Sequence, residues 1–435
     1  MSACAKRGEI SGSLEEGLVA ARVVGGMPIT TSREPVPPNA FVIPKFCYHL
    51  RVLPDIKSFT CEELEEQFRS FDEPAYRVGQ LLDWLYTRRA ANWEAMTNLP
   101  KALREKLAAN FSLLTHTLAR KQGSADTTQK FLWQLADGAF IESVLIPANP
   151  ALYGEASDRH TLCISTQVGC AYGCKFCASG LDGWKRNLGV HEIVEQILAT
   201  ERWNEKESFK FSVSSVQPEV LNTENLKLKT ISAPRLINNI VVMGMGEPLA
   251  NYDNLLKALK ILNAPWGGGI GARKITISTS GLAPQIRRLA NEPHQFRLAI
   301  SLHGATDEVR NRIMPVNKKY PLEELTAACE NYQELKGRMI TLEYILIAGV
   351  NDTLAQTKPL GALARRLYAK VNLIPYNKVE GLPWQRPSEE VCEGFLAALT
   401  AQKVTATLRR EKGGDIDAAC GQLRLQTERE LSPQA

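Results

Sequence analysis

The chain has 435 residues, of which 44% are hydrophobic and 23% charged, the composition of a globular protein with room for one large domain and accessory segments. No apolar run approaches the roughly 20 residues of a membrane helix, and the first residues lack the apolar core of a secretory signal. The net charge of +5 is compatible with a nucleic-acid partner but does not demand one. We expect a cytoplasmic protein, without membrane attachment, in which clustered cysteines are ligands or catalysts.

The first part of the chain divides into an extension and a helical segment. Residues 1–55 are rich in Gly, Ser and Pro and show no sustained hydrophobic period, which predicts a loosely ordered extension. Residues 56–122 have apolar residues at helical spacing, and Thr60 followed by Glu63 has the pattern of a capping box. We predict a small helical domain. Its basic residues form either an ordinary solvated face or a surface that binds nucleic acid.

Residues 123–150 have the alternation of a β-hairpin linker. The two alternating runs flank Asp137 and Gly138, a strong two-residue turn signal, and the second run carries Glu142. A carboxylate in such a run is ordinarily a solvated charge on an edge strand. The residues alone therefore give Glu142 no special role.

Residues 151–425 alternate short β-rich runs with helical patterns, which indicates a parallel sheet with right-handed crossovers. About six such units are too few for a closed eight-fold barrel, so we predict an α/β fold of the partial, open TIM-like type. Functional residues should then gather at the carboxyl ends of the strands. A polar, Ser- and Lys-rich stretch over residues 204–236 predicts a surface insertion, and residues 426–435 a flexible tail.

A cluster of cysteines follows the predicted strand from Leu162 to Val168. Three of them form a C-x3-C-x2-C array on a loop, namely Cys170, Cys174 and Cys177. A zinc site needs a fourth ligand, which His160 or His191 could provide. An iron–sulfur cluster fits better, because thiolates are its usual ligands and three of them leave one iron of a four-iron cluster open to a small molecule.

Small or polar residues recur after the later predicted strands. These residues are Gly246, Glu247, Ser278, Ser301, His303 and Asn377, and the apolar Leu302 lies between Ser301 and His303. Each alone could be an ordinary turn or cap, but four successive strands that carry such groups at the same end predict a binding site.

The C-x3-C-x2-C array with Phe176 before its last cysteine resembles the radical S-adenosylmethionine (SAM) enzymes, which share a partial barrel. A narrower resemblance covers nearly all of residues 60–425. The ordered motifs TLCISTQVGCAYGCKFCASG, VVMGMGEPLANYDN, ITISTSGLAP, LAISLHGATDEVRNRIMPVNKKYPL, TLEYILIAGVND, LIPYN and GGDIDAACGQLR are similar to the RlmN branch of the RlmN/Cfr family of RNA methyltransferases. The helical segment, with RVGQLLDWLY and MTNLPKALREKL, resembles the N-terminal RNA-binding domain of that family.

The resemblance implies one [4Fe-4S] cluster on the three cysteines and SAM at the seven strand-end positions. It further implies two SAM molecules per turnover, one of which methylates Cys420 to S-methylcysteine while the other provides the radical that attacks this methyl group. Cys163 matches the thiol that resolves the RNA adduct through a transient disulfide with Cys420, and Glu142 matches the proton acceptor. From the residues alone, Cys163 is an ordinary core cysteine, whereas the glycines and basic residues near Cys420 could favour its thiolate.

The implied activity is methylation of adenine C2 in 23S rRNA, at an adenosine of the peptidyl transferase centre, and in tRNA, at the adenosine 3′ of the anticodon. The alternative within the family is the adenine-C8 methylation of the Cfr type. An alternative of another class is an RNA-binding protein with a structural metal and no turnover. The expected partners are 23S rRNA, tRNA and an electron donor such as flavodoxin or ferredoxin, and the chain is expected to be a monomer.

Overall fold

The computed structural model describes residues 53–124, 127–148, 158–214, 235–409 and 421–431. These residues belong to a single unit, Val52–Ala435. Most of the predicted extension and the middle of the predicted insertion lie outside the described residues, and so does Cys420.

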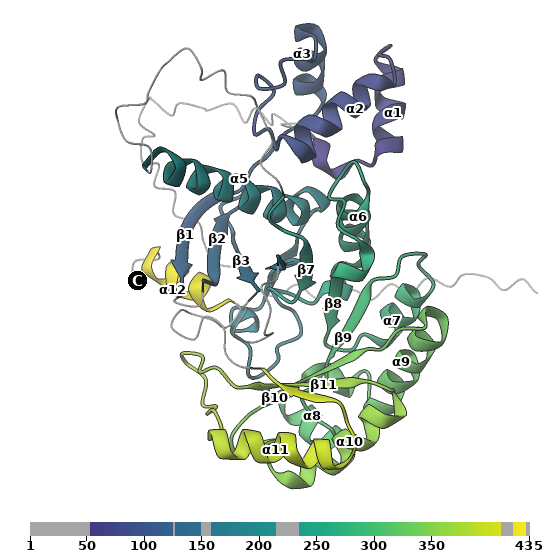
Figure 1. Ribbon diagram of the computed structural model, residues 1–435, viewed down its shortest axis with the longest axis vertical. Helices are drawn as coiled ribbons and strands as arrows, with labels where there is room; N and C mark the ends of the chain where they lie inside the picture. Colours follow the sequence, from purple (N-terminus) through teal and green to yellow (C-terminus); the bar gives the residue numbers. More distant parts are fainter. Residues whose placement is uncertain (1–52, 125–126, 149–157, 215–234, 410–420, 432–435) are drawn as a thin grey trace, which may run out of the picture. The chain divides into compact units, whose positions relative to one another are not determined.

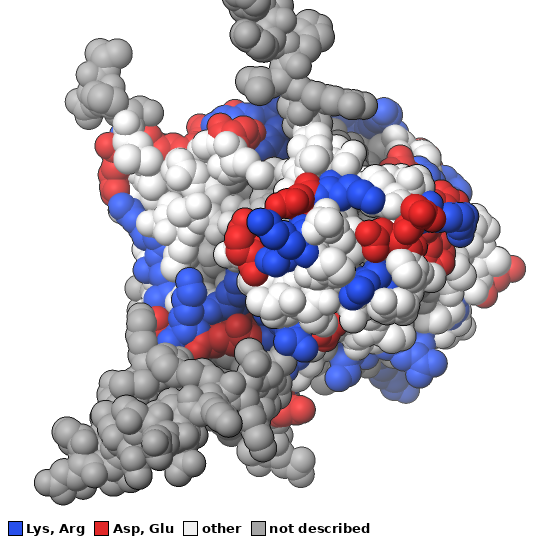
Figure 2. All heavy atoms as spheres, turned by 90° about the horizontal axis from the view of Figure 1, so that it is seen from above, with Lys and Arg blue, Asp and Glu red and all other residues white. Residues whose placement is uncertain are grey.

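The described chain begins with the predicted helical segment. Its elements are η1 (Ile56–Ser58), α1 (Cys61–Ser70), α2 (Tyr76–Leu82), the π-helical turn η2 (Asp83–Thr87) and α3 (Lys101–Asn110). The capping box of α1 is present, because the Thr60 hydroxyl accepts the Glu63 N–H at 3.3 Å and the Glu63 carboxylate accepts the Thr60 N–H at 2.8 Å. Figure 2, which views the molecule from above, shows basic and acidic side chains interspersed over that face.

A ten-stranded sheet follows, in the order β1-β2-β3-β4-β7-β8-β9-β10-β11-β12. Its strands are β1 (Thr117–Gly123), β2 (Gln129–Gln134), β3 (Phe140–Pro147), β4 (His160–Cys163), β7 (Asn239–Val242), β8 (Ile275–Thr279), β9 (Arg297–Ser301), β10 (Thr341–Leu346), β11 (Lys370–Pro375) and β12 (Ala406–Leu408). Pairing is antiparallel from β1 to β4 and parallel from β4 to β12. Among the described strands, β1 and β12 remain the two ends of the sheet, which confirms an open α/β fold.

Helices connect successive parallel strands, as the alternation predicted. They are α5 (Val190–Ser214), α6 (Tyr252–Asn263), α7 (Ala283–Ala290), α8 (Asp307–Ile313), α9 (Leu322–Lys336), α10 (Thr357–Arg366), α11 (Glu389–Ala401) and, after β12, α12 (Gln422–Leu431). Figure 1 shows α6, α7, α9, α10 and α11 along the outer side of the curved sheet. One continuous cluster of buried apolar side chains runs from the helical segment through the sheet to α11.

Buried ion pairs join the helical segment to α5. Lys57 lies 3.3 Å from Asp55 and 3.6 Å from Glu195, and all three side chains are at most 1% exposed. Arg89, also buried, lies 3.6 Å from Glu201 of α5. Charges removed from water need such partners, because an unpaired buried charge costs several kcal/mol, about 3–5 when a partner is removed. The helical segment and α5 are therefore bound to each other by charge as well as by apolar packing.

Several boundaries differ from those expected. Strand β1 begins at Thr117, inside the stretch predicted as helical, because it pairs with β2 along its whole length. Helix α5 continues to Ser214, into the stretch predicted as an insertion. Helix α12 occupies much of the predicted tail and is held by Leu423, which packs in a buried cluster with residues of β2 and β3. No helix among the described residues is long and apolar enough to cross a membrane.

Candidate active site

Two glycines, Gly169 and Gly183, lie against each other at the base of the cysteine loop. Between β4 and α5 the chain forms a two-stranded ribbon of β5 (Gln167–Gly169) and β6 (Trp184–Asn187), with the 3-10 turn η3 (Ala178–Gly180) between them. Gly169 has φ +76°, and a Cβ there would meet the carbonyl oxygen of Gly183 at 2.0 Å. The Cys170 N–H donates to the same carbonyl at 3.0 Å. Only glycine fits at residue 169. The close approach of Gly169 to Gly183, called the pinch below, makes the segment with the three cysteines a separate loop.

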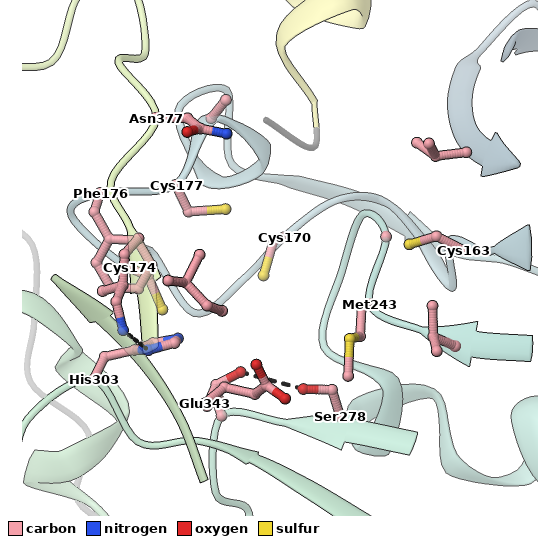
Figure 3. A pocket seen from close by; sticks show the side chains of 18 of the residues that line it. Cys163, Cys170, Cys174, Phe176, Cys177, Met243, Ser278, His303, Glu343 and Asn377 are labelled. Carbon is pink, nitrogen blue, oxygen red and sulfur yellow. Dashed lines mark hydrogen bonds between the residues drawn. The ribbon is translucent and has the colours of Figure 1, made fainter. Parts of the chain in front are cut away.

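All three cysteines of the array line one cavity of about 360 Å³, together with Cys163 at the end of β4. Figure 3 shows the sulfurs of Cys170, Cys174 and Cys177 gathered on one side, with Cys163 further along the cavity. Burial raises the pKa of the Cys170 thiol to about 12 and that of Cys174 well above its usual value. Burial therefore disfavours the ionised thiolates, and a bound cation is needed here to lower the thiol pKa again.

The two histidines that could have completed a zinc site lie elsewhere. His160 contacts the carbonyl oxygen of Asp158 through Nδ1 at 2.9 Å, and His191 faces the Ser58 hydroxyl at 3.4 Å. Neither lines the cavity. Within the described ranges, no three His, Cys, Asp or Glu side chains are arranged to hold a single metal ion. The donor set fits an iron–sulfur cluster instead, because each thiolate of such a cluster binds a different iron.

The loops after β7 and β8 are tied together by Glu247. This carboxylate is buried and accepts the N–H of Leu249 at 3.0 Å and the N–H of Ser280 at 2.7 Å. Burial raises the pKa of Glu247. Gly246 and Glu247 both line the cavity, so this predicted pair lies where expected. Its carboxylate also has a structural role that the sequence did not indicate.

The next strands bring further predicted residues into the same cavity. The hydroxyls of Ser278 and Ser301, at the ends of β8 and β9, lie 3.3 Å apart across the sheet. Asn377, which follows β11, also lines the cavity and accepts a 3.5 Å contact from Arg386. Leu302 does not line the cavity: its side chain points into the apolar core beneath β9. Its backbone is engaged as well, because its N–H donates to the Glu343 carbonyl and its own carbonyl accepts from Arg310, both at 3.0 Å.

His303 is a neutral hydrogen-bond donor in this cavity. Its Nδ1 accepts the N–H of Ile345 on β10 at 3.1 Å, which leaves the ring proton on Nε2. Burial, assisted by the nearby Arg310 charge, lowers the pKa of His303 to about 3. The ring packs edge-on against Phe176 of the cysteine loop, with centroids 5.0 Å apart. These contacts fix both the tautomer and the orientation of the imidazole, as a binding site requires.

Two buried charged residues of the site were not predicted from the sequence. Glu343 of β10 lines the cavity and accepts the Asn372 amide at 2.7 Å, and burial raises its pKa. Arg310 of α8 lies behind the cavity and donates to the carbonyls of Leu302, at 3.0 Å, and Ser280. No short-range pattern marks either residue. Only the packing of distant segments reveals their roles.

The residues matched to catalysis occupy different surroundings. Cys163 is buried and lines the cavity beside the three cysteines of the array. Glu142 is not on an edge strand: β3 lies between β2 and β4, and the side chain is 2% exposed. Its carboxylate binds Lys130 and the backbone at the start of α12. Cys420 lies outside the described residues, and its predicted approach to Cys163 stays a prediction.

Comparisons with known proteins agree with this geometry. Residues 164–357 match the family model of the radical SAM superfamily, and residues 55–113 match that of the ribosomal RNA large subunit methyltransferase N-terminal domain. A radical SAM methyltransferase from Sphaerobacter thermophilus, solved as a crystal structure, superimposes with a TM-score of 0.74 at 41% identity and covers 85% of this chain and 98% of its own.

Curated relatives extend the likeness over most of the chain. The probable dual-specificity RNA methyltransferase RlmN 3 of Opitutus terrae is 54% identical over 87% of this chain and 96% of its own. The dual-specificity RNA methyltransferase RlmN of Anaeromyxobacter dehalogenans is 43% identical over 85% of this chain and 91% of its own. With the cavity, the open sheet and the helical segment all in agreement, the chain belongs to the RlmN family of radical SAM RNA methyltransferases.

Proposed function

We propose that this chain methylates adenine C2 in 23S rRNA and in tRNA, through an S-methylcysteine formed on Cys420. The observation that supports this most directly is the shared cavity, which is lined by the three cysteines of the array, by Cys163 and by six of the seven predicted SAM residues, all except Leu302. Relatives named as dual-specificity RNA methyltransferases, and the match to their N-terminal domain, favour C2 over C8 methylation.

Family membership implies a [4Fe-4S] cluster and SAM, and the cavity residues fit both groups. Cys170, Cys174 and Cys177 would hold the cluster. When bound, the cluster and SAM supply one-electron chemistry that can remove a hydrogen atom from an unactivated methyl group. The chain's own residues orient the cofactor: His303 can donate from Nε2, and the loop that Glu247 fixes can offer its backbone groups.

The remaining steps of the proposed reaction require two thiols and one carboxylate. We propose that Cys420 carries the methyl group and that the thiolate of Cys163, buried at the cavity wall, attacks the Cys420 sulfur of the RNA adduct. The S–S bond then forms as the bond between the Cys420 sulfur and the transferred carbon breaks, and this carbon takes up a proton to become the methyl group of the product. Glu142 would accept the proton from the adenine. Two SAM molecules would be consumed per turnover, and an external reductant such as flavodoxin or ferredoxin would supply the electrons. We further propose that the chain acts as a cytoplasmic monomer.

The test is anaerobic reconstitution with iron and sulfide, followed by assay with SAM, a reductant and unmodified rRNA fragment or tRNA. Mass analysis of the digested RNA should show 2-methyladenosine in both substrates. Cys163→Ala should retain the cluster absorption and lose the product, whereas Cys61→Ala, a matched change on α1, should retain both. An 8-methyladenosine product would establish the Cfr-type alternative. RNA binding without any SAM consumption would favour a non-catalytic protein.

A further inference from the structure

The carboxylate of Glu142 anchors the first turn of α12. Its Oε2 accepts the N–H of Gly421 and its Oε1 the N–H of Arg424, both at 2.7 Å. The first N–H groups of a helix have no partner within the helix and carry its positive end, so a buried carboxylate satisfies them well. A residue matched to proton transfer thus has a structural role that joins the middle of the sheet to the C-terminal helix.

Lys130 completes this arrangement from the neighbouring strand. It lies on β2, its side chain is fully buried, and its Nζ is 3.0 Å from Glu142 Oε2. In the antiparallel register Leu132 stands opposite Glu142, so Lys130 reaches the carboxylate diagonally across the two strands. Two charges buried together depend on each other, because removing one leaves the other unpaired away from water. Lys130 therefore determines where the Glu142 carboxylate rests.

The anchored turn also contacts the cysteine loop. Gly421 has φ +88°, and a Cβ there would meet the Ser179 hydroxyl at 2.8 Å and the Ser179 nitrogen at 2.9 Å. Ser179 lies in η3, two residues after Cys177. The buried Arg424 guanidinium lies 3.3 Å from Asp182 of the same loop. The start of α12 is thus held between the sheet, through Glu142, and the loop that carries the cluster cysteines.

The N–H that Glu142 Oε2 accepts belongs to the peptide bond that joins Gly421 to residue 420. On the basis of the proposed function, we propose that Lys130 is a positioning residue for the methyl-carrying cysteine. Its ammonium fixes the Glu142 carboxylate, and the carboxylate fixes the N–H of Gly421, the residue that directly follows Cys420 in the sequence. Lys130 also lines the cavity, but the effect proposed here acts through the Glu142 carboxylate.

Hydrogen exchange on the full chain tests this inference without requiring activity. In Lys130→Met, the amides at the start of α12 should exchange at least about tenfold faster than in the unchanged protein, since two charge-assisted hydrogen bonds lose their fixed acceptor. Alkylation of Cys420 by iodoacetamide, followed by peptide mass analysis in cluster-free protein, should accelerate as well. Lys130→Arg, which keeps the charge, should restore much of the protection.

Lys257→Met is the matched control. It removes an equal charge from an ion pair, Lys257–Glu63 at 2.7 Å, that lies between α6 and α1 and away from α12. This variant should leave α12 exchange, Cys420 alkylation and RNA methylation unchanged. In reconstituted enzyme, Lys130→Met should lower kcat more than it raises KM for RNA, with normal iron content, because the defect lies in cysteine placement.

Unchanged α12 exchange and Cys420 alkylation in a folded Lys130→Met protein would overturn the inference. If that variant fails to fold, Glu142→Gln serves instead: its amide has one acceptor oxygen for two N–H donors, so at least one of the two anchors must open. Protection of both amides in Glu142→Gln would equally overturn it. Because exchange is read without turnover, absence of RNA methylation by the unchanged enzyme would defeat the proposed function but not this anchor.

Discussion

Replacement of Arg310 by Met should lower the free energy of unfolding of the protein. The guanidinium is fully buried and donates to the carbonyl oxygens of Leu302 and Ser280 and, at 2.6 Å, to the Asn317 amide oxygen. Met has a similar length but no donor, so three buried acceptors lose their partner. Each such loss costs about 1–3 kcal/mol. Burial also lowers the pKa of Arg310 to about 10, and the change to Met relieves this desolvation. The net loss should be about 3 kcal/mol.

Urea unfolding followed by far-ultraviolet circular dichroism measures this loss. Arg312→Met is the matched control, because Arg312 lies on the same helix, α8, with its side chain exposed. Arg310→Lys should fall between the two, since one ammonium cannot reach all three acceptors. The loops that Arg310 joins carry Ser280 and Leu302, so SAM affinity, measured by titration of the reconstituted protein, should also fall. An Arg310→Met protein as stable as the Arg312→Met control would refute the reasoning.

Three further changes have defined outcomes. In urea unfolding, His303 should contribute a loss of stability as the pH falls from 6.5 toward about 3, because the unfolded chain protonates this imidazole while the folded chain does not. His303→Asn, which suits the positive φ, should flatten this contribution, and an equal pH slope in the two proteins would contradict it. The raised pKa of Glu343 gives a contribution of the opposite sign, which destabilises the protein as the pH rises above 4.5. Glu343→Gln, which still accepts the Asn372 amide, should therefore be more stable than the unchanged protein at high pH and equally stable below 4.5. Gly169→Ala should reduce iron uptake on reconstitution to less than about half that of the unchanged protein. Gly138→Ala, which is also at positive φ but whose new Cβ would meet no atom within 4 Å, should not reduce it. Equal iron contents in the two variants would exclude the proposed pinch.

Short-range patterns predicted the fold well. The Thr60–Glu63 capping box, the Asp137-Gly138 hairpin and the alternation of strands and helices are each encoded within a few residues, and the open α/β fold is confirmed. The strand expected from Leu162 to Val168 was only partly right: β4 ends at Cys163 and β5 begins at Gln167, because the chain must turn out of the sheet to form the cysteine ribbon.

The same short-range patterns could not predict contacts between residues far apart in the sequence. Glu142 had the pattern of an exposed edge charge, yet β4 covers that edge and α12, some 280 residues later, reaches its carboxylate. Arg310 lies in a helix rich in charges, and nothing nearby in the sequence distinguishes it from the exposed Arg312. Leu302 was predicted as a SAM-binding residue, but it lies just past the end of β9 with its side chain in the apolar core.

The ion pairs between the helical segment and α5 bear on whether the chain can be divided. Removing residues before 114 would take Lys57 and Arg89 away, whereas Glu195 would keep Arg202 and Glu201 the N–H groups of Leu236 and Ile237. A catalytic core expressed alone would lose these ion pairs and expose the apolar side chains that the helical segment covers, so the fragment should be poorly soluble or unstable. The two parts therefore form an obligate pair, in which substitutions on either side are tolerated only if the opposite charge is kept.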